Sequence, residues 1–254
     1  MISPRVSIPA PFLFGPRKVA GDEGRGKTYL SDVVDGQAVI FDVDGTLVDS
    51  NDAHAAAWQE VLKEFGIARD FAAIRRLIGM GGDKLLPVLT GIAADSEDGK
   101  RIVERRSRRF RQAYLRELRP FPGVRDLLAR LAGDGFRLGV ASSAKKDELD
   151  ALLDLAGVRD LIQRATSSDD VDASKPDPDA LHAAMKMLRV SPETATMVGD
   201  TPYDVEAAAR AGVPVLALRC GGWRDADLAG ARAIFDDPRD LLAHVAPALF
   251  GRAA

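Results

Sequence analysis

The sequence has a single cysteine and no long apolar run. Cys220 cannot form an internal disulfide by itself, which excludes a disulfide-stabilised fold and is typical of a reducing compartment. No apolar stretch approaches the roughly 20 residues that cross a bilayer. The N-terminal region also has no uninterrupted apolar segment of the kind that a signal peptide requires. We therefore expect a cytoplasmic protein that does not bind a membrane.

An excess of charge of one sign is lacking as well. The chain carries 35 Lys and Arg residues against 38 Asp and Glu residues, a formal net charge of −3. This balance provides no overall positive field, so nucleic acid is not an expected partner. A hydrophobic content of 46% and a charged content of 29% are typical of a folded globular protein, and 254 residues are enough for one large domain or two small ones.

Residues 1–36 differ in pattern from the rest of the chain. Prolines at positions 4, 9, 11 and 16 interrupt any apolar periodicity, so we expect a flexible N-terminal extension. Within it, Gly21–Thr28 matches the P-loop pattern GxxxxGK[ST], which needs a buried strand before it and a helix after it. Pro16 interrupts the segment where the strand would lie, and the segment after Thr28 is too short for the helix. We expect no nucleotide site there.

From residue 37 onward, short apolar runs alternate with helical patterns. This alternation is typical of βαβ units, so we expect an α/β protein with a Rossmann-like parallel sheet. The apolar runs are Gln37–Asp42, Phe136–Ser142, Thr194–Asp200 and Val213–Leu218, with a weaker one at Ala233–Asp236. The helical patterns between them are Gly123–Asp134, Lys146–Gly157, Asp177–Arg189 and Pro202–Gly212.

A long stretch without strand patterns separates the first apolar run from the second. Residues 51–119 instead hold helical patterns at Ala53–Phe65, Phe71–Ile78, Lys84–Leu89 and Lys100–Leu118. We therefore expect a helical domain at 51–119, inserted into a catalytic core of 37–50 and 120–254.

The helical pattern at Lys100–Leu118 is rich in arginine. Its apolar stripe of Val103, Phe110, Tyr114 and Leu118 indicates that most of these arginines face solvent.

Polar side chains follow three of the apolar runs. Because ligands bind at the carboxyl ends of parallel strands, we expect these side chains to converge on one site. They are Asp42 and Asp44 after the first run, Ser142 and Ser143 at the end of the second, Lys175 farther along the chain, and Asp200 and Asp204 after the third. Several carboxylates in one crevice repel one another. Their oxygen-only ligation favours Mg²⁺ as the compensating cation.

This set of side chains predicts phosphoryl transfer. A carboxylate at Asp42, beside Mg²⁺ and a lysine, stays ionised and can act as a nucleophile. The turn through Gly45 brings Asp44 across the site, where it can give a proton to a leaving oxygen and later take one from water. Lys175 and a hydroxyl can hold phosphate oxygens. We expect the reaction to pass through an aspartyl-phosphate.

The same residues resemble the four signatures of the haloacid dehalogenase superfamily. Asp42–Ser50 is similar to the first signature (DxDGT), and Ser142 in VASSA resembles the second. Lys175 in SKPDP resembles the third, and Gly199–Asp204 (GDTPYD) the fourth. The resemblance extends over about residues 37–246. It also makes the insert at 51–119 similar to the family's C1 cap.

This resemblance implies a role for each site residue. Asp42 would be the nucleophile and Asp44 the general acid and base. The Asp42 carboxylate, the Asp44 backbone carbonyl and Asp200 would hold Mg²⁺. The remaining roles are phosphate binding by Ser142, Ser143 and Lys175, and support of the metal or its waters by Asp204.

The resemblance also narrows the choice within the superfamily. Its dehalogenases lack the second aspartate, so Asp44 argues against dehalogenation. Its phosphosugar mutases share His54, which could orient Asp44, and Trp58, which fits a helix core. Where those mutases have a phosphate-binding arginine, this sequence has Gly82. The glycine-rich segment around it is more similar to phosphatases related to phosphoglycolate phosphatase.

The expected function is therefore Mg²⁺-dependent hydrolysis of a small phosphorylated metabolite by a monomer or homodimer. Substrate contacts from the insert are expected at His54, Gly79, Met80 and Gly81. A phosphosugar mutase of the β-phosphoglucomutase type uses the same core residues and is one alternative. A non-catalytic ligand-binding protein on this scaffold is another, although binding alone does not require the acid/base group at Asp44.

Overall fold

A computed structural model describes residues 36–245 and Leu249. The N-terminal extension predicted for residues 1–36, with its P-loop-like stretch, lies outside these residues apart from Gly36. Among the residues described, no helix is both long enough and apolar enough to cross a membrane.

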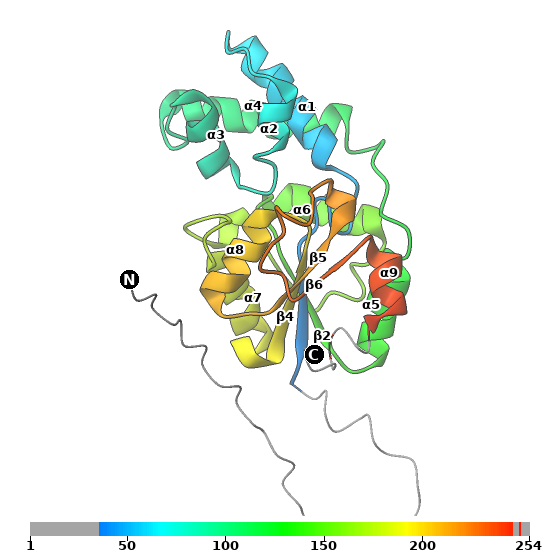
Figure 1. The fold of residues 1–254 in the computed structure, drawn as a ribbon. Helices are drawn as coiled ribbons and strands as arrows, with labels where there is room; N and C mark the ends of the chain where they lie inside the picture. Colours follow the sequence, from blue (N-terminus) through cyan, green and yellow to red (C-terminus); the bar gives the residue numbers. More distant parts are fainter. Residues whose placement is uncertain (1–35, 246–248, 250–254) are drawn as a thin grey trace, which may run out of the picture.

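A six-stranded sheet lies at the centre of the molecule (Figure 1). The neighbouring strands are parallel and lie in the order β3-β2-β1-β4-β5-β6, which confirms the predicted α/β class. The strands are β1 (Ala38–Phe41), β2 (Arg137–Ala141), β3 (Arg164–Thr166), β4 (Ala195–Gly199), β5 (Val215–Leu218) and β6 (Ala233–Phe235). The short edge strand β3 was not predicted, because its three residues begin with an exposed arginine and form no apolar run.

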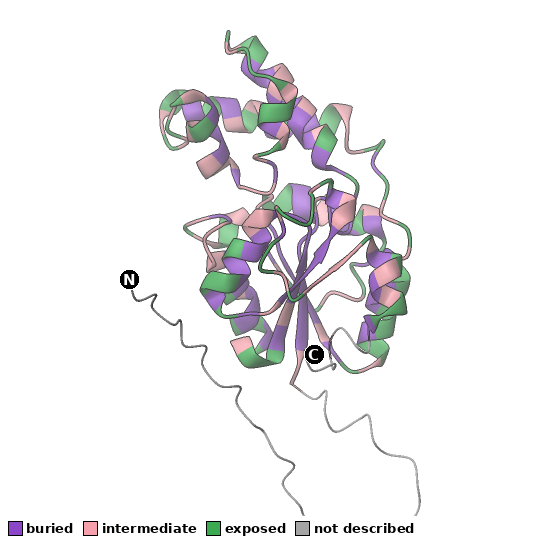
Figure 2. Cartoon of the chain, in the orientation of Figure 1, coloured by how far each residue is buried: buried purple, intermediate pink, exposed green. Residues whose placement is uncertain are grey.

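Helices cover both faces of the sheet, and the side chains of β1 alternate between them. Val39 and Phe41 pack with α5 (Val124–Gly133), α6 (Lys146–Ala156) and α9 (Pro238–Ala243) on one face. Ala38 and Ile40 pack with α7 (Asp179–Leu188) and α8 (Pro202–Ala211) on the other. The central strands β1, β2, β4 and β5 are consequently buried almost throughout, whereas the edge strands β3 and β6 are partly exposed (Figure 2).

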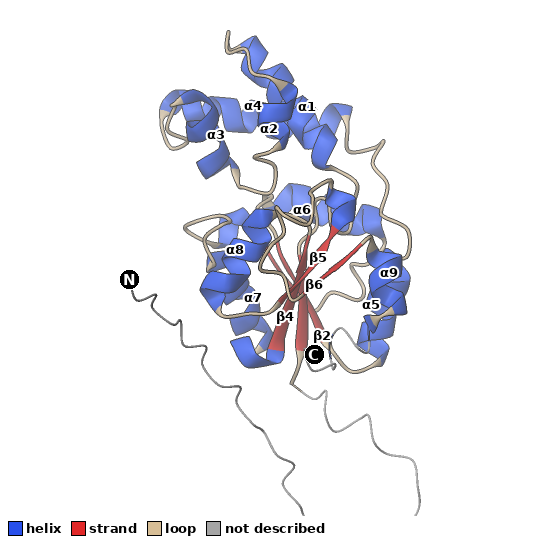
Figure 3. Cartoon of the chain, viewed as in Figure 1, coloured by secondary structure: helices blue, strands red, loops and turns tan. Residues whose placement is uncertain are grey.

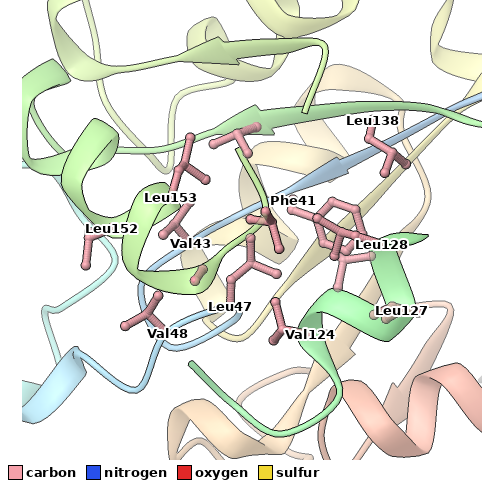
Figure 4. Close-up of a cluster of buried hydrophobic side chains, with 14 of the residues drawn as sticks. Phe41, Val43, Leu47, Val48, Val124, Leu127, Leu128, Leu138, Leu152 and Leu153 are labelled. Carbon is pink, nitrogen blue, oxygen red and sulfur yellow. The ribbon is translucent and has the colours of Figure 1, made fainter. Parts of the chain in front are cut away.

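The segment after β1 is anchored in the first of these cores. Val43, Leu47 and Val48 are fully buried and pack with residues of α5 and α6 such as Val124 and Leu152 (Figure 4). Asp42 and Asp44 lie directly before and after Val43 in the chain. Their backbone is therefore fixed by packing on the apolar side of the same loop.

The helices α1 (Asn51–Glu64), α2 (Phe71–Arg75), α3 (Gly82–Thr90) and α4 (Glu97–Ala113) lie beyond the carboxyl ends of the strands (Figures 1 and 3). We call these four the cap helices. They have an apolar core of their own, which includes Trp58, Leu62, Ile74, Leu86 and Ile102. The division into domains at residues 50 and 119 stays a prediction.

The predicted orientation of α4 is wrong in part. Ile102 and Phe110 are fully buried on its inner face, whereas Val103 is only half-buried. Arg101, Arg108 and Arg111 are exposed as predicted, and Arg105 and Arg109 are partly exposed. The side chain of Arg106, however, is only 12% exposed. It is buried because an acidic partner, Glu148, faces it from α6. A single sequence does not indicate such a distant partner.

Candidate active site

The candidate site lies where β2, β1 and β4 end. Ser142, Asp42 and Asp200 each follow the last residue of one of these neighbouring strands. The structure therefore brings together three segments that are far apart in the sequence, and Lys175 joins them.

The carboxylates of Asp42, Asp200 and Asp204 form the centre of the site. One oxygen of each lies within 4.8 Å of the others, and all three residues are buried. The Lys175 ammonium contacts the Asp42 carboxylate and lies 2.7 Å from Asp204 Oδ1. The charged state of this lysine is strongly favoured: burial lowers its pKa, but the charges of Asp204 and Asp42 outweigh burial and raise it.

Asp204 is positioned by the first turn of α8. Asp204 N donates to Thr201 Oγ1 at 3.2 Å and Asp204 Oδ2 accepts from Thr201 N at 3.0 Å, which together form a capping box. The same Oδ2 accepts a hydrogen bond from Thr201 Oγ1 at 2.7 Å. It also accepts one from Asp200 N at 3.2 Å. Pro202, at the first helical position, suits this start because no amide hydrogen is needed there. The GDTPYD sequence thus fixes Asp204 Oδ1 toward Lys175.

Asp200 is held by two residues that the sequence analysis did not single out. Thr46 Oγ1 donates to Asp200 Oδ1 at 2.9 Å, and Asn51 Nδ2 donates to Asp200 Oδ2 at 2.9 Å. Thr46 belongs to the DxDGT signature, which was a signal for it. Asn51 follows that signature and has no comparable signal. Gly45 and Gly221 allow this close packing, because a Cβ atom at either would lie within 2.3 Å of Asp200 Oδ2.

The charges at this centre do not balance. Burial, with the neighbouring carboxylates Asp204 and Asp44, raises the pKa of Asp42 to about 7, even though Lys175 opposes the shift. Burial and the charges of Asp204 and Asp42 also raise the pKa of Asp200 well above its ordinary value. One lysine faces three buried carboxylates, so this donor set fits a cation bound by oxygen ligands.

The Asp44 carboxylate is not part of this cluster and has partners of its own. Its Oδ1 accepts a hydrogen bond from Ser50 Oγ at 2.5 Å and lies 2.6 Å from His54 Nε2. Burial alone would raise the pKa of Asp44, but the interactions with His54, Ser50 and Arg106 outweigh burial and lower it. The His54 ring is stacked on Phe110 with 3.9 Å between the ring centroids. Asp44 is therefore a separate, ionised carboxylate at the edge of the site.

The two predicted phosphate-binding serines lie in the loop after β2. Ser142 is buried, and its Oγ accepts a hydrogen bond from Ala144 N at 3.0 Å. Ser143 Oγ donates to Gly79 O at 3.2 Å, so it joins this loop to the segment between α2 and α3.

A cavity of about 610 Å³ lies between the strand ends and the cap helices. Asp42, Asp44, His54, Gly79 and Met80, all predicted, line it with Ser143. Gly81 is not among its lining residues. Its backbone amide instead donates to Ser174 Oγ at 3.1 Å, next to Lys175.

The cavity also has charged lining residues that were not predicted to face a substrate. Arg106 and Glu148 line it together with Asp83, Lys100 and Lys145. The arginine pattern of α4 was a signal for Arg106, but its period does not distinguish an inward arginine from its exposed neighbours.

Known proteins resemble this chain in sequence and in fold. The chain is 38% identical over 213 residues to the phosphoglycolate phosphatase of Rhodospirillum rubrum, covering 79% of this chain and 87% of that protein. It is 32% identical to a phosphoglycolate phosphatase of Cupriavidus necator, covering 85% and 96% of the two chains. The crystal structure of a hydrolase from Pseudomonas syringae has a TM-score of 0.75 and 31% identity, covering 82% and 97%.

A family profile gives the same result. The profile described as haloacid dehalogenase-like hydrolase matches residues 39–218, which include Asp42, Lys175 and Asp200. The match thus spans most of the chain and the whole buried centre. The chain belongs to the haloacid dehalogenase-like hydrolases.

Proposed function

We propose that the protein is a phosphatase that hydrolyses a small phosphorylated acid of the phosphoglycolate type through an aspartyl-phosphate at Asp42. The observation that carries this proposal is the buried centre of Asp42, Asp200, Asp204 and Lys175 beside the separate carboxylate of Asp44. The two phosphoglycolate phosphatases support the reaction and the kind of substrate. A cavity of about 610 Å³ supports a small metabolite, because small-molecule sites occupy about 300–1,000 Å³.

We assign Mg²⁺ to the carboxylate centre. Asp42 and Asp200 would hold it together with the Asp44 backbone carbonyl, and Asp204 would support it. When bound, Mg²⁺ supplies positive charge that keeps Asp42 ionised and offsets the charge on the phosphoryl oxygens.

The residues of this chain then have complementary tasks. An oxygen of Asp42 attacks phosphorus, and the bond from phosphorus to the ester oxygen breaks. Asp44 gives its proton to that leaving oxygen. Asp44 is ionised in the free protein, and the arrival of a phosphate dianion raises its pKa and favours uptake of the proton. Lys175 and the loop of Ser142 and Ser143 hold the phosphoryl oxygens.

The second half of the reaction reverses the role of Asp44. As a carboxylate it accepts a proton from the water that attacks the phosphorus of the aspartyl-phosphate, which releases inorganic phosphate and restores Asp42. The cap helices exclude other water during both steps. A cytoplasmic location and a monomeric or dimeric state stay predictions from the sequence.

The test is phosphate release from a panel of esters: phosphoglycolate, other phosphorylated acids, sugar phosphates and p-nitrophenyl phosphate. Each is assayed with Mg²⁺, with a chelator and with Asp42→Asn. We expect Mg²⁺-dependent release that the variant abolishes, with phosphorylated acids among the best substrates. No release from folded protein would contradict a phosphatase. Transfer of phosphate to a sugar from a sugar bisphosphate primer, without net release, would establish the mutase alternative.

A further inference from the structure

A chain of four side chains connects the core to the cap helices and returns to the core. Glu148, on α6, forms an ion pair with Arg106 of α4 at 3.0 Å. A second nitrogen of the same guanidinium contacts His54 Nδ1, and His54 Nε2 lies 2.6 Å from Asp44 Oδ1. We propose that Arg106 and Glu148 are positioning residues, which fix the His54 ring and thereby the general acid Asp44. This inference rests on the proposed phosphatase function.

The donors and acceptors in this chain assign the tautomer of His54. A guanidinium has only donors, so its contact with Nδ1 requires the lone pair of that nitrogen. The ring proton is then on Nε2, where it is donated to Asp44 Oδ1. Arg106 therefore determines which hydrogen bond the acid/base carboxylate accepts, although it does not contact that carboxylate itself.

Stacking fixes the plane of the same ring. Arg106 and Phe110 are one helical turn apart on α4, so both reach His54 from one face of the helix. Phe110 lies parallel to the imidazole at an interplanar angle of 10°. The Arg106 guanidinium lies over the rings of Trp58 and Phe110 at 5.5 and 5.2 Å from their centroids. The imidazole is thus held by Phe110 on its face and by Arg106 and Asp44 at the two nitrogens of its edge.

The burial of this ion pair distinguishes it from its neighbours. The Glu148 side chain is 1% exposed and that of Arg106 is 12% exposed. Arg111 and Asp147 join the same two helices, at 3.2 Å, but their side chains are 40% and 81% exposed. A buried ion pair contributes little net stability after desolvation, so adhesion of α4 to α6 does not require one. The contact of Arg106 with His54 indicates that this ion pair positions the imidazole ring instead.

The arrangement couples closure of the cap helices to proton transfer. Asp44 and Glu148 belong to the core, whereas Arg106 and His54 belong to α4 and α1. Any movement of the cap helices away from the core therefore separates Arg106 from Glu148 and His54 from Asp44. Asp44 then keeps its hydrogen bond from Ser50 but loses the one from His54.

The activity test compares a poor leaving group with a good one. An alkyl phosphate such as phosphoglycolate needs a proton on its leaving oxygen, whereas p-nitrophenolate leaves without one. Arg106→Met keeps an unbranched apolar stem over Trp58. We expect it to lower the ratio of kcat/KM for the alkyl ester to kcat/KM for the aryl ester about tenfold. This loss is part of the roughly 10²–10⁴-fold that acid catalysis contributes. Glu148→Gln should lower it less, and the double variant no further than Arg106→Met.

Arg111→Met and Asp147→Asn are the matched controls, and we expect both to keep the wild-type ratio. Equal losses for the two esters in Arg106→Met, or additive losses in the double variant, would overturn the inference. If Arg106→Met does not fold, an unchanged ratio in folded Glu148→Gln overturns it. Wild-type protein that cleaves neither ester would contradict the proposed function itself.

A second measurement does not depend on activity. The chain has three histidines, so the ¹⁵N resonances of each ring can be assigned. At one fixed pH we expect His54 to carry its proton on Nε2 in the wild type and in Arg111→Met, and to become a mixture of tautomers in Arg106→Met. A wild-type ring with its proton on Nδ1 would overturn the inference, whatever the kinetics show.

Discussion

The ammonium of Lys175 lies 2.7 Å from Asp204 Oδ1 and also contacts Asp42, so one cation joins the first turn of α8 to the end of β1. We expect Lys175→Met to lower kcat at least about a hundredfold, because the charge that favours ionised Asp42 is lost. Removing one member of a buried ion pair also costs about 3–5 kcal/mol of unfolding free energy. Kinetics and urea unfolding measure the two effects. Wild-type activity in a folded variant would exclude Lys175 from the reaction.

The raised pKa of Asp42 predicts how stability depends on pH when no cation is bound. Burial raises this pKa to about 7, from an ordinary value of about 3.9 in an unfolded chain. Between these two values the folded protein binds a proton that the unfolded chain does not. The free energy of unfolding should therefore fall as the pH rises from about 4 to about 7.

Urea unfolding at several pH values, in the presence of a chelator, tests this dependence. Mg²⁺ should reduce the decline because it binds the ionised form. Asp42→Asn has no carboxyl group to titrate at this position, so its free energy of unfolding should fall less over the same pH range. Equal curves for the wild type and this variant would contradict the prediction.

Gly221 is required where the chain passes Asp200. A Cβ atom at this position would lie 1.8 Å from Asp200 Oδ2. We expect Gly221→Ala to displace this carboxylate and to raise the Mg²⁺ concentration for half-maximal activity about 10–100-fold, as when the support of a metal ligand is lost. Gly133→Ala is the matched control, because nothing lies within 4 Å of its added methyl group. An unchanged Mg²⁺ requirement in Gly221→Ala would argue against Asp200 as a ligand.

Asp83 joins α3 to the loop that carries Lys175. Its Oδ2 accepts a hydrogen bond from Ser174 N at 3.3 Å, and its Oδ1 accepts one from Ser174 Oγ. We expect Asp83→Ala to raise KM about tenfold with a smaller effect on kcat, since hydrogen bonds to a charged group contribute about 1.5–3 kcal/mol. Asp98→Ala, which removes an exposed carboxylate from α4, should leave KM unchanged. These hydrogen bonds would lower KM by favouring closure of the cap helices over the substrate. An unchanged KM in Asp83→Ala would mean that the contact between Asp83 and Ser174 does not favour this closure.

The sequence predicts the sheet well because buried parallel strands are continuous apolar runs, as in β1, β4 and β5. It does not predict β3, whose place depends on pairing with β2 rather than on its own composition. Asp42, Asp44 and Asp200 are predictable because strand ends converge in any parallel sheet. Asn51 and Glu148 are not, because their importance depends on a partner far along the chain.

The place of β1 between β2 and β4 has a consequence for the order of synthesis. Thr46 and Asp200, which touch in the folded protein, are 154 positions apart in the chain. Asp42, the proposed nucleophile, emerges from the ribosome early, whereas Asp200 and Asp204 emerge only with β4 and α8. A nascent or truncated chain that ends before β4 therefore carries Asp42 without the carboxylates of Asp200 and Asp204. Such fragments should be inert toward phosphate esters, so premature termination yields no uncontrolled hydrolase.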